Sequence, residues 1–93
     1  MTQVLTAQSR VTLKTLYRMQ WEAAQQAHVL LYPEGMITLN ESASEILSLC
    51  RGQLTIAEII HTLEQKFPQA GPLADDVYEF LTVALSNGWI ESK

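Results

Sequence analysis

Few side chains in this sequence have the types and spacing that catalysis requires. His28 and His61 lie far apart, and the chain contains no HExxH, no CxxC and no glycine-rich phosphate loop. A single cysteine, Cys50, excludes an intramolecular disulfide and any multi-cysteine metal site. Asp75 and Asp76 are adjacent rather than facing each other, and a place at the positive start of a helix explains both. The sequence therefore predicts no catalytic residues, no metal site and no cofactor.

Composition limits the partners as well as the chemistry. The 93 residues suffice for one compact domain, and 47% of them are apolar while 17% are charged, which is typical of a globular fold. The formal net charge is −4, and the six Lys and Arg residues are scattered. Nucleic-acid binding needs clustered cations, so this balance argues against it. We expect a cytoplasmic protein, because no stretch matches a signal peptide or a membrane span.

Local patterns predict a three-stranded antiparallel meander in the first half of the chain. Residues 16–21 alternate in polarity, residues 28–32 form an apolar run, and residues 36–39 follow a turn at Pro33 and Gly35. Residues 1–14 show no periodicity and are expected to be a mobile tail. Residues 15–93 are expected to form a single domain.

The second half of the chain predicts three helices, which makes the fold class α+β. Asn40 is a candidate cap for a first helix whose apolar stripe runs to Cys50 and ends at Gly52. Thr55 and Glu58 have the spacing of a capping box, which starts a second helix. A third helix is expected over residues 73–86.

The third helix has more apolar residues than one buried stripe needs. Two stripes share it, the first comprising Val77, Phe80 and Ala84 and the second comprising Tyr78, Leu81 and Leu85. Such a helix is either fully buried or leaves one face for a partner. A groove beside the helix, completed by residues 36–39 as an edge strand, would accept a peptide by strand addition.

Several motifs together resemble the PqqD family of pyrroloquinoline quinone biosynthesis proteins. They are LLYPEG, LNESASEILSLC with Gly52 after it, TIAEII, DDVYEFL and GWI, and they span residues 18–90. Arg51 stands where the family often has an aspartate. The resemblance implies a winged-helix-like fold that binds a ribosomally made precursor peptide, PqqA, and presents it to the radical SAM enzyme PqqE. In such domains the peptide lies as an added strand between the third strand and the third helix.

Mapped by motif, the resemblance implies a set of peptide-binding residues. They are Met36, Ile37, Thr38 and Leu39 on the strand, and Asp75, Asp76, Tyr78, Glu79, Leu81 and Leu85 on the helix. The backbone groups of Ile37 and Leu39, or those of Met36 and Thr38, would pair with the peptide, depending on a register that the sequence leaves open. The apolar helix residues would contact apolar peptide side chains, and the three carboxylates would contact a basic one.

Other functions remain open from the sequence. A PqqD-like domain could serve another modified peptide, and the fold class also includes DNA-binding proteins, although acidic residues on the third helix would repel phosphate. A stand-alone enzyme has no residues to support it. The apolar surface could also be self-complementary, so both a monomer and a dimer are expected possibilities.

Overall fold

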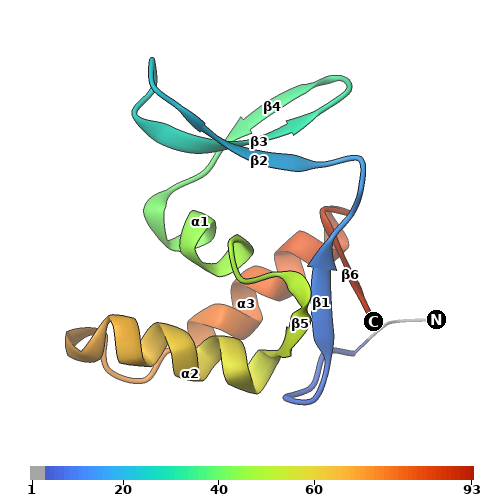
Figure 1. Ribbon diagram of the computed structural model, residues 1–93. Coiled ribbons are helices and arrows are strands. Elements are labelled where there is room, and N and C mark those ends of the chain that lie inside the picture. The colour runs from blue at the N-terminus through green and yellow to red at the C-terminus, as the bar shows by residue number, and fades with distance from the viewer. Residues whose placement is uncertain (1–3) are drawn as a thin grey trace.

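The computed structural model describes residues 4–93, which contain two three-stranded antiparallel sheets and three α-helices (Figure 1). The elements in chain order are β1 (Arg10–Leu13), β2 (Arg18–Glu22), β3 (Ala27–Tyr32), β4 (Gly35–Thr38), α1 (Glu41–Leu47), β5 (Arg51–Thr55), α2 (Ile56–Lys66), the 3₁₀ turn η1 (Pro68–Ala70), α3 (Ala74–Ser86) and β6 (Ile90–Ser92). One sheet has the order β2-β3-β4 and the other the order β5-β1-β6. The α+β class is confirmed.

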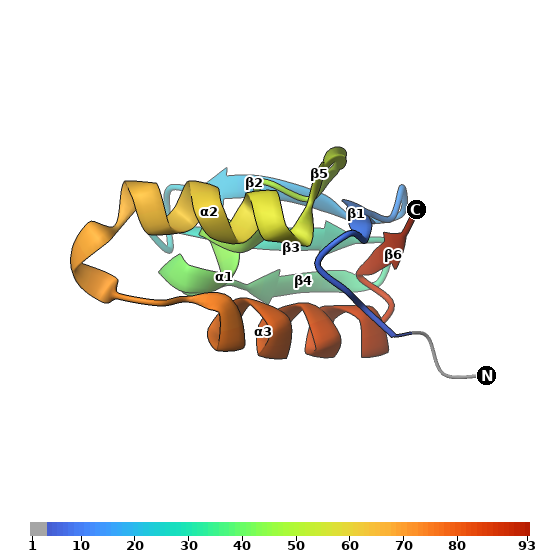
Figure 2. The ribbon, with the colours of Figure 1, turned by 90° about the horizontal axis from the view of Figure 1, so that it is seen from below.

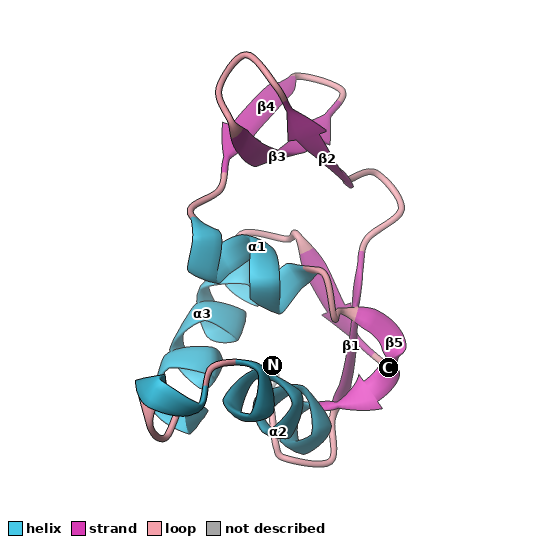
Figure 3. Cartoon of the chain, turned by 60° about the vertical axis from the view of Figure 1, so that its left-hand side comes forward, coloured by secondary structure: helices cyan, strands magenta, loops and turns pink. Residues whose placement is uncertain are grey.

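The predicted meander is the β2-β3-β4 sheet. Met19 lies opposite Leu30, and Leu30 lies opposite Ile37, so these three side chains share one face of the sheet. That face packs on the core, where Leu30 is fully buried. Figure 3 shows this sheet on one side of α1, with α2 and α3 on the other.

The first helix begins as predicted but ends early. The Asn40 side chain accepts a hydrogen bond from the Ala43 N–H at 2.7 Å, which caps α1. The helix stops at Leu47, so the prediction that Cys50 extends its stripe and that Gly52 ends it is wrong. Cys50 is nevertheless buried. Gly52 lies in β5 with a φ of 78°, where the register between β1 and β5 is irregular.

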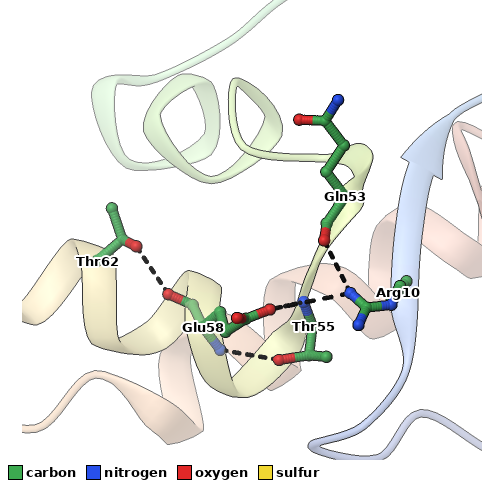
Figure 4. Close-up of polar contacts among 5 residues, drawn as sticks. All are labelled: Arg10, Gln53, Thr55, Glu58 and Thr62. Carbon is green, nitrogen blue, oxygen red and sulfur yellow. Dashed lines mark hydrogen bonds and ion pairs between the residues drawn. The ribbon is translucent and has the colours of Figure 1, made fainter.

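The start of α2 carries the predicted capping box. The Glu58 N–H donates to the Thr55 hydroxyl at 3.1 Å, and the Thr55 N–H donates to the Glu58 carboxylate at 2.8 Å (Figure 4). The backbone hydrogen bond from Thr55 lowers the pKa of Glu58. Because the pKa is lowered on folding, the carboxylate half of the box is lost only as the pH falls through that lowered value.

The N-terminal segment is part of the fold, which corrects the prediction of a mobile tail over residues 1–14. Residues 10–13 form β1, the central strand of the β5-β1-β6 sheet, while residues 1–3 lie outside the described residues. The carbonyls of Ala7 and Ser9 accept the Ala57 and Ile56 N–H groups at the start of α2. The Arg10 guanidinium donates to the Gln53 carbonyl at 2.7 Å. The segment therefore supplies partners for the otherwise unpaired amides of a helix terminus.

The third helix lies behind α1 and α2 and buries one narrow stripe. Val77, Leu81 and Ala84 are its buried residues. Figure 2 shows α2 and α3 on opposite sides, with α1 and β4 between them in projection. Among residues 4–93, no helix is long and apolar enough to cross a membrane.

Two valines test the corrected role of the N-terminal segment. Val11 is 0% exposed and Val4 is 75% exposed, so the same truncation removes a core contact only at Val11. We expect Val11→Ala to lower the free energy of unfolding in urea by about 2 kcal/mol. We expect Val4→Ala to change it by less than about 0.5 kcal/mol. Equal effects would restore the interpretation of this segment as a tail.

Two threonines of the α2 region test the capping box. Thr55→Ala removes the cap hydroxyl and is expected to cost about 1 kcal/mol in the free energy of unfolding. Thr62 is the control, since its hydroxyl only donates to the Glu58 carbonyl within the helix, at 2.8 Å. Thr62→Ala should be neutral or slightly stabilising because alanine has the higher helix propensity. A Thr55→Ala variant as stable as wild type would show that the hydroxyl half of the box contributes nothing.

Candidate functional site

The outer edge of β4 offers unpaired backbone groups. Within residues 4–93, β4 pairs with β3 and no strand pairs with its other edge. The Leu39 N–H donates to the His28 carbonyl at 2.9 Å, so this opposed pair is a hydrogen-bonded one. Hydrogen-bonded and non-hydrogen-bonded pairs alternate along an antiparallel ladder. Ile37 therefore also bonds to β3, whereas the N–H and C=O groups of Met36 and Thr38 point to the open edge.

The side chains along β4 and Leu39 alternate between the core and the solvent. Ile37 packs against the core and Leu39 is buried, so these two residues hold the strand on the molecule. Met36 is 45% exposed on the outer face. Thr38 is also exposed, and its hydroxyl donates to Gln25 Oε1 at 2.6 Å. The open edge thus consists of backbone N–H and C=O groups. Of the two predicted alternatives, only Met36 and Thr38 have these groups free, because those of Ile37 and Leu39 face β3.

The position of Leu81 does not fit its predicted role. Leu81 is fully buried between Val77 and Ala84 in the core, and its side chain cannot line a surface groove. Periodicity placed it in the second apolar stripe of the helix, but the packed stripe of α3 is centred on it. A charged residue at this position would disrupt the core.

Two flanks of α3 border the buried stripe. At 3.6 residues per turn, Asp76, Phe80 and Val83 lie on one flank, and Tyr78 and Leu85 lie on the other. Asp75 and Glu79 are exposed on the side of the helix turned away from the core. The sequence therefore grouped residues that the helix separates.

The flank with Asp76 is the one turned toward α1 and the meander. Asp76 lines a pocket together with Glu41 of α1. Phe80 packs on Trp89, with ring centroids 6.5 Å apart, and the Trp89 carbonyl accepts the N–H of Lys14, the first residue of the β1–β2 connection. Val83 is 47% exposed on the same flank. Figure 2 shows β4 as the strand of its sheet nearest α3 in projection, so the open edge and this flank border the same side of the molecule.

We call this region the β4–α3 surface, defined by the edge backbone of Met36 and Thr38 and the side chains of Asp76, Phe80 and Val83. The first three were among the predicted residues. Phe80 was assigned to the core stripe, and Val83 to neither stripe. Periodicity did not single out this flank, because the exposure of Val83 depends on which elements pack against α3.

The side chains whose types could take part in catalysis or metal binding lie outside the β4–α3 surface. Burial raises the pKa of the Cys50 thiol to about 12, so no thiolate nucleophile forms at neutral pH. His28 packs edge-on against Trp21, with ring centroids 5.2 Å apart. Among the described residues no group of three His, Cys, Asp or Glu side chains could hold a metal ion. The β4–α3 surface offers hydrogen bonds and apolar contacts.

Several bacterial relatives match most of the chain. A PqqA binding protein of Klebsiella pneumoniae (strain 342) is 52% identical over 82 residues, covering 88% of this chain and 89% of the relative. A PqqA binding protein of Methylococcus capsulatus is 55% identical over 78 residues, covering 84% of this chain and 83% of the relative.

Two solved structures share the fold. The solution NMR structure of the PqqD truncation of Methylobacterium extorquens PqqCD, described as a stand-alone recognition element for ribosomally made and modified peptides, superposes with a TM-score of 0.78. It is 24% identical and is matched over 95% of each chain. The heterocyclase TruD superposes with a TM-score of 0.69 at 15% identity, over 91% of this chain and 12% of that one. At these identities the likeness shows the fold alone.

The sequence model of the family described as coenzyme PQQ synthesis protein D matches residues 27–90. This match runs from the start of β3 to the start of β6 and contains both α3 and the edge strand β4. Together with relatives that are more than half identical over most of their length, it confirms the resemblance seen in the motifs. The chain belongs to the PqqD family.

Proposed function

We propose that this chain is a recognition element that binds the precursor peptide PqqA by strand addition to β4 and presents it to the radical SAM enzyme PqqE. The observation that carries the proposal is the open edge of β4, where Met36 and Thr38 turn their backbone groups away from β3. The relatives named as PqqA binding proteins support the choice of peptide. The protein acts in the cytoplasm and contributes no catalytic residue.

The open edge suits a peptide whose sequence is not read along its whole length. An added strand pairs its own N–H and C=O groups with the edge, and each such bond contributes about 0.5–1.5 kcal/mol. Ile37 and Leu39 keep β4 in place through the core while this happens. The strand therefore receives the peptide without rearranging its own side chains.

Side-chain recognition falls to the Asp76 flank of α3. Phe80 and Val83 provide apolar contact beside the added strand, and Asp76 provides a carboxylate for a basic residue. Within the described structure, Tyr78 and Leu85 lie on the opposite flank. In this proposal the meander with its three helices is winged-helix-like, and the β5-β1-β6 sheet lies in the same fold.

The mechanism is tethering. A peptide held on β4 while the domain contacts the enzyme reaches the active site at a high effective concentration, and no chemistry in this chain is needed. The fold serves to keep one strand edge open and one helix flank beside it.

A proline at position 38 tests the edge. Thr38→Pro removes an N–H that points away from β3, so it should weaken PqqA binding about tenfold in an NMR titration while the thermal midpoint changes little. Thr38→Val is the matched control, since it loses only the hydroxyl bonded to Gln25 and should bind like wild type. Ile37→Pro removes a β3–β4 bond and should impair folding. If Thr38→Pro binds PqqA as wild type does, strand addition at this edge is wrong.

Neighbouring residues on the two flanks of α3 test which flank faces the peptide. Val83→Asp places a charge beside Phe80, and we expect it to weaken PqqA binding by about five- to tenfold. Thr82→Asp places the same charge on the flank of Tyr78, whose carbonyl accepts the Thr82 hydroxyl at 2.8 Å, and should leave binding unchanged. The reverse result, measured by calorimetry on both variants, would assign the peptide to the Tyr78 and Leu85 flank.

A further inference from the structure

A pocket of about 370 Å³ lies among α1, α2, η1 and the first turn of α3. Its apolar wall comes from three helices and comprises Ile46, Leu63, Phe67 and Val77. Three of these four are core residues, so the wall is part of the fixed interior of the protein. The volume lies at the low end of the range of small-molecule sites, which is about 300–1,000 Å³, and suits a side chain better than a cofactor.

The turn that closes the pocket is fastened by a hydrogen bond. The Leu73 N–H donates to the Glu64 carboxylate at 2.8 Å, which joins the start of α3 to the last turn of α2. The pocket is therefore formed before any ligand arrives. A preformed site costs less ordering entropy on binding than one that the ligand must organise.

Carboxylates surround the pocket. Glu41, Glu45 and Asp76 all line it, and no basic side chain does so. Glu45 lies 2.8 Å from Lys66 Nζ and is neutralised by it. Among residues 4–93, neither Glu41 nor Asp76 has a cation within ion-pair distance. The pocket thus combines an apolar interior with uncompensated negative charge, which is complementary to an apolar side chain beside a basic one.

The pocket continues the proposed peptide path. Glu41 is the third residue after Thr38, the last residue of β4, and Asp76 starts the α3 flank that continues through Phe80 and Val83. A strand paired with β4 advances about 3.3 Å per residue. A few residues of peptide beyond the Thr38 end are therefore enough to reach the pocket.

We propose that this pocket is a second subsite for the bound peptide, which takes one bulky apolar side chain while a neighbouring lysine or arginine contacts Glu41 and Asp76. The subsite rests on the proposed function, since it serves the part of the peptide that extends past β4. It makes the peptide's register specific, because edge hydrogen bonds alone permit the strand to slide by two residues.

Filling the pocket tests the apolar half of the subsite. Ser42 is an exposed residue that lines the pocket, and Ser42→Trp places a large side chain there without removing a core residue. We expect about tenfold weaker binding of PqqA by calorimetry. Ser86→Trp is the control, because Ser86 is exposed at the far end of α3 and does not line the pocket. Both variants are checked for folding by their amide NMR spectra.

Charge reversal tests the acidic half of the subsite. This experiment is informative even if Ser42→Trp fails to fold. Glu41→Lys should weaken PqqA binding about three- to tenfold at low salt, and the difference should shrink as salt is added. Glu79→Lys makes the same change in net charge on a part of α3 outside the pocket, and should have little effect. Equal losses in the two variants would show only a general attraction and would overturn the subsite.

Replacing the basic residues of PqqA one at a time identifies the partner of Glu41. One replacement should weaken binding to wild type but cause no further loss in Glu41→Gln, which is the coupling expected of residues in contact. If wild type binds PqqA and no replacement couples, the subsite is wrong while strand addition stands. If wild type itself does not bind PqqA, with or without PqqE, the proposed function and the subsite both fail.

Discussion

The pairing of β1 with β5 on one side and β6 on the other is the contact on which the rest of the architecture depends. β5 leads directly into α2, and β6 follows α3, so one strand holds an end of each long helix. The carbonyls that precede β1 also accept the first amides of α2. The β5-β1-β6 sheet thereby joins α2 to α3, while the meander packs on the same core through Leu30. Within residues 4–93, β1, β5 and β6 pair only with one another, and the outer edge of β4 stays free.

Alternate residues along β4 anchor the strand to the core and present free backbone groups at its edge. Ile37 and Leu39 bury their side chains and bond to β3, while Met36 and Thr38 expose their side chains and direct their backbone outward. An unprotected sheet edge is ordinarily an aggregation hazard, which short edge strands reduce. At four residues, β4 is short enough to limit that hazard and long enough to present two outward-facing residues.

Interactions between near neighbours in the chain could be predicted from the sequence, and distant ones could not. The Asn40 cap and the Thr55–Glu58 box each join residues three apart, and both are present. β1 escaped prediction because Arg10 pairs with Thr55, far along the chain, and four residues show no period of their own. On α3, periodicity identified two apolar stripes, but the choice of Leu81 as a surface residue failed because burial depends on which elements pack against the helix.

In the proposed strand addition, the outward backbone groups of β4 would also set how long a peptide stays bound. Met36 and Thr38 can each exchange at most a donor and an acceptor with an added strand, at about 1 kcal/mol per bond. Much of that gain is offset by the entropy lost when a flexible peptide is ordered. A peptide held in this way dissociates readily, because differences in affinity appear mainly in the dissociation rate. In the proposed role the protein would release one peptide and accept the next, so a small number of copies would supply the enzyme through many cycles.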